Sequence, residues 1–259
     1  MKGKQKYKLI RGTLLLIMVV CLIPVIQAYF QSIRHQKQQK QIRMHLEEVR
    51  TEEPEIQTGI DTGGHREILD KYKSVYNENQ DLAGWLTIEG TAIDYPVMQC
   101  EDDEFYLSHN FYRETDKYGC LYVKNIADLD SPGTNFIIYG HNMKDGSMFG
   151  ELERYRNHDF YREHAHISFD TLYEERTYEV MAVFPFRLYE EDQPFQYYKF
   201  YRANTEAEFI DFYENVCKLA LYDTGVTASF GDTFLTLSTC AGDGADQRFV
   251  VVAKRVDLL

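Results

Sequence analysis

Cysteine is scarce in this chain, and its spacing excludes the common cysteine-based metal sites. The 259 residues hold five cysteines, and none forms a Cys-x-x-Cys pair or another zinc-like spacing. Cys21 lies in an apolar segment, which leaves four in the rest of the chain. Their number requires no disulfide, although it permits a Cys100–Cys120 bond. The pattern therefore implies no metal and no other cofactor.

Positive charge is lacking over most of the chain. The sequence has 28 Lys+Arg against 41 Asp+Glu, a formal net charge of −13. Residues 1–64 hold 10 of the basic and 6 of the acidic residues, so this first part carries +4. Residues 65–259 therefore carry −17. A body this acidic disfavours nucleic acid as a partner.

Charge is absent altogether from residues 12–30, GTLLLIMVVCLIPVIQAYF. As a helix this run spans roughly 28 Å, close to the ~30 Å hydrocarbon core of a bilayer. A cleavable signal peptide is the alternative, but its apolar core is shorter, and no Ala-x-Ala-like site follows. Basic residues lie on both sides of the run, so charge does not set the orientation of the span in the membrane. The short N-terminal tail and the large C-terminal body favour a signal anchor with the body outside. We expect a cytoplasmic basic tail over 1–11, a transmembrane signal anchor over 12–30 and the body outside the cell.

A polar linker over 31–64 is predicted between the anchor and a folded domain over 65–259. Residues 31–50 are helix-prone, whereas 51–64 contain Pro54 and three glycines. Helical periodicity occurs at 65–79, 147–164 and 205–223. Short strands are predicted at 84–88, 93–98, 119–123, 135–139, 166–169, 177–186, 233–238 and 248–256. Eight strands with few helices predict a mainly-β, closed or nearly closed barrel with peripheral helices.

The stretch FLTLSTCAGDGADQRFVVVAKRV, residues 234–256, holds the strongest chemical pattern. Cys240 ends its first strand and Arg248 opens the next, eight residues later. A fixed cation beside a thiol favours the thiolate and stabilises an oxyanion. The alternative for Cys240 is a small buried hydrophobic residue at a strand end.

His141 is the best candidate for a base, because it follows the predicted strand 135–139 after one glycine. Two strand-end residues of one barrel can converge at one rim. Asn142 and Asp243 are near in sequence, but no carboxylate clearly completes a triad. The stretch HDFYREHAH suggests a metal site, yet no fourth ligand is apparent. The hypothesis is therefore a cysteine nucleophile served by a histidine and an arginine.

These motifs resemble those of class B sortases, which are membrane-anchored cysteine transpeptidases of Gram-positive bacteria. TLSTC with an arginine eight residues on, YGHNMKDGSMFGEL and QRFVVVAKRV carry the resemblance, which covers about 65–259. It implies an eight-stranded barrel in which His141, Cys240 and Arg248 are catalytic. The substrate-binding positions that it implies are Leu107, Phe195, Gln196, Tyr197, Ser238 and Thr239.

The resemblance also implies a reaction. A secreted protein with a C-terminal sorting signal resembling Asn-Pro-x-Thr-x is cleaved after Thr through a thioacyl-enzyme and joined to a cell-wall amine of a lipid II-like precursor. A pilin-polymerising sortase, with a pilin lysine as acceptor, is one alternative, although no Asp-Pro-aromatic lid is found. A non-catalytic ectodomain that binds the cell wall is another. A papain-like hydrolase fits less well, because its cysteine precedes its histidine.

Overall fold

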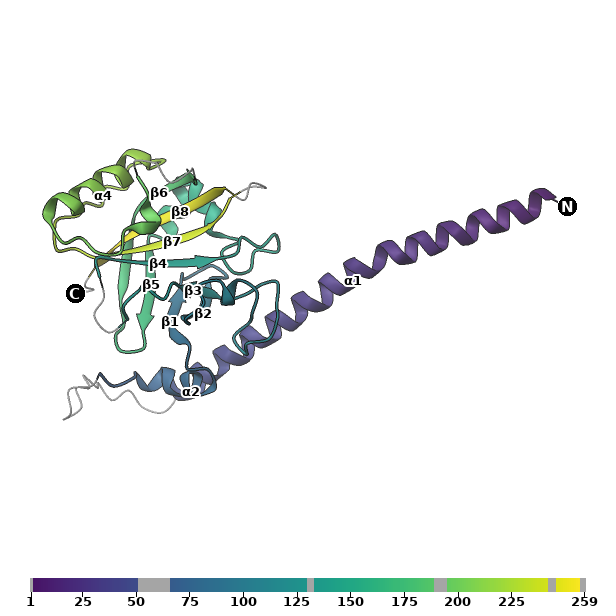
Figure 1. The fold of residues 1–259 in the computed structure, drawn as a ribbon, viewed down its shortest axis with the longest axis horizontal. Coiled ribbons are helices and arrows are strands. Elements are labelled where there is room, and N and C mark those ends of the chain that lie inside the picture. The colour runs from purple at the N-terminus through teal and green to yellow at the C-terminus, as the bar shows by residue number, and fades with distance from the viewer. Residues whose placement is uncertain (1, 51–65, 130–132, 189–194, 242–245, 257–259) are drawn as a thin grey trace. The chain divides into compact units, whose positions relative to one another are not determined.

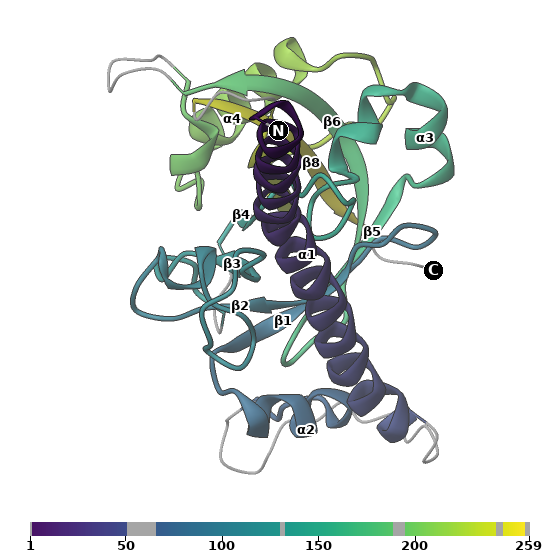
Figure 2. The same ribbon diagram turned by 90° about the vertical axis from the view of Figure 1, so that its right-hand side faces the viewer.

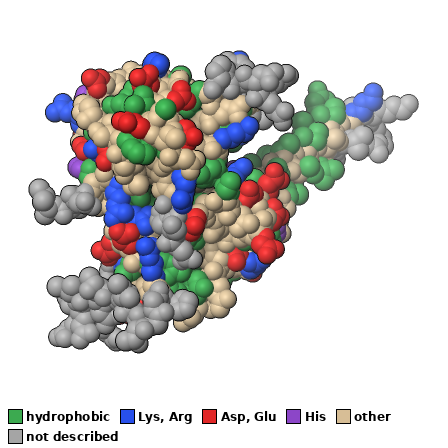
Figure 3. Space-filling model, turned by 60° about the vertical axis from the view of Figure 1, so that its left-hand side comes forward, with side chains coloured by type: hydrophobic (Ala, Val, Ile, Leu, Met, Phe, Trp, Pro, Cys, Tyr) green, Lys and Arg blue, Asp and Glu red, His purple; other side chains and the backbone are tan. Residues whose placement is uncertain are grey.

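The computed structural model describes residues 2–50, 66–129, 133–188, 195–241 and 246–256, which belong to two compact units, Met1–Glu52 and Glu53–Leu259. The first unit is a single helix, α1 (Lys2–Arg50), which contains Pro24. Within it, Ile10–Leu46 includes a window of mean hydropathy 2.4, long and apolar enough to cross a membrane. Figure 3 shows apolar side chains along this part of α1. The helix runs through both the expected anchor and residues 31–50, and the remaining linker, 51–64, lies outside the described residues.

The second unit, here called the barrel unit, is built on eight strands. Their order around the closed barrel is β1-β2-β3-β4-β7-β8-β6-β5. Two neighbouring pairs, β2–β3 and β4–β7, are parallel, and the others are antiparallel. The strands are β1 (Leu82–Thr87), β2 (Asp94–Met98), β3 (Leu121–Val123), β4 (Asn135–Gly140), β5 (His166–Thr171), β6 (Thr177–Arg187), β7 (Phe234–Cys240) and β8 (Gln247–Val256). Each overlaps one predicted strand, and the predicted closed barrel is confirmed.

The helices of the barrel unit differ in part from the predicted ranges. The described helices are α2 (Asp70–Glu78), α3 (His158–Glu163) and α4 (Glu206–Leu219), with 3-10 turns η1 (Phe105–Leu107), η2 (Leu152–Arg156) and η3 (Tyr197–Lys199). The stretch 147–164, predicted as one helical region, is divided into η2 and α3. Asn157 causes the division: its backbone is extended, and its side chain caps α3 by accepting from the Asp159 amide. Figure 2 shows α3 at the edge of the barrel.

Alternation along β7 separates two apolar clusters. Leu235 and Leu237 point into the barrel core, whereas Phe234 packs outside with Phe209 and Phe212 of α4. Helix α4 therefore covers the outer face of β6, β7 and β8 (Figure 1). Because side chains alternate along a strand, Ser238 and Cys240 share the outer face with Phe234. The outer face near the end of β7 is thus where functional groups can gather.

Candidate active site

The parallel pairing of β4 with β7 brings His141 beside Cys240. Gly140 and Thr239 are the last register pair of the two strands, and the Thr239 hydroxyl donates to the Gly140 carbonyl at 2.8 Å. His141 and Cys240 each follow that pair by one residue. A Cβ at position 140 would lie 2.4 Å from Cδ2 of Leu121 in β3, so the packing of β3 against this end of β4 needs glycine. The predicted convergence of the two strand ends is what the register produces.

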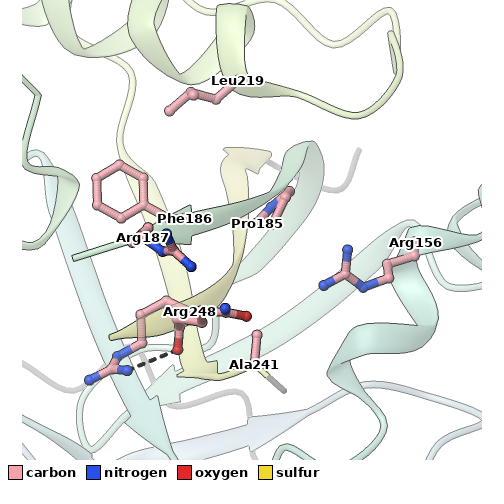
Figure 4. Close-up of a pocket in the computed structure, with 8 residues that line it drawn as sticks. Arg156, Pro185, Phe186, Arg187, Leu219, Ala241 and Arg248 are labelled. Atoms are coloured by element: carbon pink, nitrogen blue, oxygen red, sulfur yellow. Dashed lines mark hydrogen bonds between the residues drawn. The ribbon is translucent and has the colours of Figure 1, made fainter. Parts of the chain in front are cut away.

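The β7–β8 hairpin places Arg248 directly opposite Cys240. The two residues are register partners, and the Ala241 amide donates to the Gln247 carbonyl at 3.0 Å. The Arg248 guanidinium donates to the same carbonyl at 2.9 Å, as the dashed line in Figure 4 shows. Facing residues of antiparallel strands have Cα atoms about 4.5–5.5 Å apart, so the arginine is within reach of the thiol. Asp243 lies outside the described residues.

The five cysteines are all free thiols, so the Cys100–Cys120 disulfide that their number permits is not formed. Cys240 is exposed, whereas Cys120 is only 2 % exposed. Burial raises the pKa of the Cys120 thiol and, less completely, that of Cys100. Within the barrel strands and their ends, Cys240 is therefore the accessible thiol that has both a histidine and an arginine beside it.

The His141 imidazole is oriented by Leu107, at the end of η1. Nε2 of His141 lies 2.7 Å from the Leu107 carbonyl oxygen. A carbonyl only accepts, so Nε2 carries a hydrogen in this arrangement, as inferred from its partner. Nδ1 is then the ring nitrogen left to exchange a proton. Leu107, predicted as a groove residue, is thus also adjacent to the histidine.

An aromatic wall lies next to Ser238. The Tyr197 hydroxyl and the Ser238 hydroxyl are 2.7 Å apart, and both residues are buried. Burial raises the pKa of Tyr197 to about 12, so this phenol stays protonated at neutral pH. Its ring packs edge-on against Phe186 of β6, with centroids 5.0 Å apart. Phe195 also contacts Phe186, with centroids 6.3 Å apart.

The remaining predicted groove positions lie close by but differ in exposure. Phe195 and Gln196 are half-buried at the start of the segment that leads into η3. Thr239 is buried, and its hydroxyl is engaged by β4. The structure therefore brings Phe195, Gln196, Tyr197 and Ser238 to one side of the site and gives Thr239 a contact between strands.

Two tyrosines on the strands beside Ser238 were not predicted. Tyr122 of β3 and Tyr139 of β4 stack with centroids 5.5 Å apart, and Tyr139 is the register partner of Ser238. Burial raises the pKa of both phenols. The sequence did contain a signal for Tyr139. It lies two residues before His141, and residues two apart on a strand point to the same face. Recognising it required the β4–β7 pairing, which the sequence does not reveal.

A pocket of about 370 Å³ adjoins the end of β7 on the β6–β8 side (Figure 4). Ala241 and Arg248 border it, and its lining also includes Arg156, Arg187 and Leu219. Arg187 pairs with Asp246 and Arg156 pairs with Glu153. Across the described ranges, no group of three His, Cys, Asp or Glu side chains could hold a metal ion.

Known proteins resemble this arrangement along most of the chain. The sequence model of the sortase domain family matches residues 86–256. The chain belongs to the sortase family. It is 35% identical to a sortase B of Listeria monocytogenes, over 69% of this chain and 70% of that one. It is also 26% identical to a sortase B of Staphylococcus aureus, over 98% of each chain.

Solved structures agree with this assignment. A Bacillus anthracis protein described as similar to sortase B has a TM-score of 0.74 and 30% identity, over 88% of this chain and 98% of that one. The relatives and structures place the chain in class B. Sortases are cysteine transpeptidases that act at the cell surface on secreted proteins with sorting signals and on cell-wall amines. The barrel unit is therefore a transpeptidase domain.

Proposed function

We propose that Cys240, His141 and Arg248 carry out transpeptidation on a sorting signal resembling Asn-Pro-x-Thr-x. One observation carries this proposal: the ends of β4, β7 and β8 bring an exposed thiol, an imidazole and a guanidinium to one rim. The acceptor is an amine of a cell-wall precursor. Cleavage follows the Thr residue of the signal.

In the first half-reaction, the thiol proton of Cys240 is held on Nδ1 of His141, and the Sγ thiolate attacks the carbonyl carbon of the substrate Thr. The carbonyl oxygen becomes an oxyanion, which the Arg248 guanidinium stabilises. His141 donates a proton through Nδ1 to the leaving nitrogen as the C–N bond breaks, and a thioester remains on Cys240. The orientation of the ring by the Leu107 carbonyl leaves Nδ1 available for this transfer.

In the second half-reaction, an acceptor amine attacks the thioester carbon. His141 takes a proton from the amine, a new amide bond forms and the Cys240 sulfur departs. Balance is restored because His141 regains the proton that it donated earlier. No oxidant, reductant or cofactor enters either step.

The groove for the signal lies between two walls of the site. We assign one wall to Ser238, Phe195, Gln196 and Tyr197, and the other to Leu107, Tyr122 and Tyr139. Thr239, buried against β4, supports the floor of this groove through its hydroxyl. The aromatic rings supply apolar area and hydroxyl tips, which suits an extended peptide with a proline.

The N-terminal helix supports a membrane-anchored form of the enzyme. We assign 1–11 to a cytoplasmic tail, 12–30 to the single membrane span and 31–64 to a linker before the catalytic domain at 65–259. The apolar window within Ile10–Leu46 supports the span. An outward-facing domain would meet both the secreted protein and the wall precursor at the outer membrane surface.

The test uses the full chain in detergent micelles with an Asn-Pro-Gln-Thr-Asn peptide, with and without a peptide that has a free amino terminus. Mass spectrometry of the products should show cleavage after Thr and a new peptide–amine conjugate, both absent with Cys240→Ala. Preferential use of a lysine side chain would instead assign pilin polymerisation. No cleavage of any peptide in a signal library would favour a non-catalytic wall-binding domain.

A further inference from the structure

The side-chain amide of Asn142 bridges the end of β7 and the turn η2. Its Nδ2 atom donates to the Cys240 carbonyl at 2.9 Å and to Oε1 of Glu153 at 2.9 Å. A primary amide has two N–H donors, so both are used. The orientation of the amide is also fixed, because a flipped Asn142 would turn its oxygen toward two acceptors.

This bridge supplies a constraint that the strand ladder does not. The register of β4 with β7 ends at Gly140 and Thr239, one residue before His141 and Cys240. Beyond that pair, the backbone bonds between these strands no longer fix the histidine relative to the cysteine. The Asn142 amide continues the connection, because Asn142 follows His141 directly and holds the carbonyl of Cys240.

The loop that carries Asn142 is itself held in place. The Phe149 amide donates to the His141 carbonyl at 2.9 Å, and Asn142 pairs with Met148 in an isolated antiparallel bridge. Met148 has φ of 55°, a left-handed conformation that is uncommon for a side chain of this kind. Such a conformation persists when its surroundings enforce it. Here it closes the loop that presents the amide to Cys240.

The second acceptor, Glu153, is anchored in turn. Nε of Arg156 donates to Oε2 of Glu153 at 3.0 Å. The Arg156 guanidinium lies over the ring of Phe249, 4.7 Å from its centroid. Phe249 is fully buried and adjacent to Arg248 in β8. The amide of Asn142 is therefore fixed at its far side by a chain of contacts that ends in the barrel core.

We infer that Asn142 is a positioning residue for transpeptidation, which fixes the backbone of Cys240 relative to His141 so that thiol and imidazole meet in reactive geometry. The inference rests on the roles proposed above for Cys240 and His141. Asn142 takes no part in bond making or breaking. Its loss should lower kcat and leave KM nearly unchanged, because the groove walls lie on other residues.

The main test replaces Asn142 with aspartate, which has the same shape. Its carboxylate oxygens can only accept hydrogen bonds, and they would face the Cys240 carbonyl and the Glu153 carboxylate, which also only accept. We expect Asn142→Asp in the full chain to lower kcat by roughly 10- to 100-fold, since small misplacement of reacting groups can cost about 10²-fold. KM for the signal peptide should stay within about twofold of the parent value, as expected when only transition-state geometry is lost. Unchanged kcat would overturn the inference.

Asn215 offers a matched control on α4. Its Nδ2 donates to the carbonyl of Asp211 at 2.8 Å and to the carboxylate of Asp211 at 3.2 Å, the same pair of acceptor types. Asn215→Asp should leave kcat within about twofold of the parent value, since a surface change away from the site has little effect. A kcat loss equal to that of Asn142→Asp would make the effect a general cost of the substitution and contradict the inference.

A double variant separates the two contacts of Asn142. In Asn142→Asp/Glu153→Gln, the glutamine amide can donate to the new aspartate, so the link to η2 is restored while the Cys240 carbonyl still faces a carboxylate. We expect kcat to stay low. Recovery of kcat would mean that Asn142 only ties its loop to η2, which would overturn the assignment.

A folding control and an activity control complete the design. If Asn142→Asp lowers the melting temperature more than Asn215→Asp does, Asn142→Ala is used instead, because it removes both donors without adding charge. Its kcat should still fall roughly tenfold, and an unchanged kcat would refute the inference.

Should Cys240→Ala remain active, the proposed function fails. Should Cys240→Ala be inactive while both Asn142 variants are normal, only the positioning role fails.

Discussion

Two cysteines sit at the ends of barrel strands and differ in almost every physical respect. Cys120 directly precedes β3, is 2 % exposed and has a pKa raised by burial. Cys240 is the last residue of β7, is exposed and lies opposite Arg248 with His141 beside it. Burial makes the first a small apolar residue, whereas exposure and neighbouring groups fit the second to react. The surroundings of each cysteine, and not the residue type, therefore determine that Cys120 serves packing and Cys240 serves chemistry.

The largest expected effect comes from exchanging the two thiols for methyl groups. Cys240→Ala should lower the transpeptidation rate on the order of 10³-fold or more, because it removes the nucleophile. Cys120→Ala should leave kcat within about twofold, since the Cys120 side chain is buried and does not meet the substrate. Product formation followed by mass spectrometry measures both. Equal losses of transpeptidation rate in the two variants would contradict the assignment of Cys240 as the nucleophile.

Replacing His141 should give the next largest effect. His141→Ala should lower kcat roughly 10²- to 10⁴-fold, the usual contribution of a general acid and base. His109 is the control: its ring stacks on Phe105 with centroids 4.0 Å apart, and its Nδ1 lies 2.8 Å from the Phe105 carbonyl oxygen. Steady-state kinetics of both alanine variants should separate them. Comparable kcat values would contradict the assignment of His141.

Replacing the arginine tests the electrostatic part of the comparison. Arg248→Lys keeps the charge but loses the planar fork, and we expect a loss of about 2.7–4 kcal/mol of transition-state stabilisation, roughly 10²- to 10³-fold in kcat. Arg187→Lys is the control, because Arg187 lies in the neighbouring strand and pairs with Asp246. Its kcat should change little. If the two lysine variants have the same kcat, Arg248 has no special role.

The free energy of unfolding should depend more on Cys120 than on Cys240, which is the reverse of the order expected for kcat. Cys120→Ser places a hydroxyl in a buried site, and burying such a group without a partner costs about 1–3 kcal/mol. Cys240→Ser changes an exposed side chain, so its free energy of unfolding should stay within about 0.5 kcal/mol of the parent value. Chemical denaturation at neutral pH measures both. A larger loss in Cys240→Ser would reverse the comparison.

The smallest expected effect is a dependence of stability on alkaline pH. Burial raises the pKa of Cys120 above its ordinary value of 9.0, so the unfolded chain releases this proton first. The stability that the parent owes to the protonated thiol is complete below about pH 9 and declines above it. Relative to Cys120→Ala, the parent should lose stability progressively as the pH rises above 9. Parallel unfolding free energies for the two proteins would show that Cys120 does not contribute.

How much of this site the sequence predicts depends on the distance along the chain between its parts. Cys240 and Arg248 belong to one hairpin, so their eight-residue spacing could be interpreted locally, and the barrel followed from eight short strand patterns. Asn142 and Cys240 are 98 residues apart, and their contact arises from a parallel pairing that no local pattern encodes. For the same reason Tyr139 could not be recognised as the neighbour of Ser238. The division of 147–164 into two short helices depends on the extended backbone and cap of Asn157.

The most direct test of the account is to find which sulfur becomes acylated. The full chain in detergent micelles is mixed with the Asn-Pro-Gln-Thr-Asn peptide without an acceptor, quenched in acid, digested and mapped by mass spectrometry. We expect a thioester to the Thr carbonyl on Cys240 alone, and its disappearance when an amine is added before quenching. An adduct on another cysteine, or turnover with no adduct on Cys240, would contradict it.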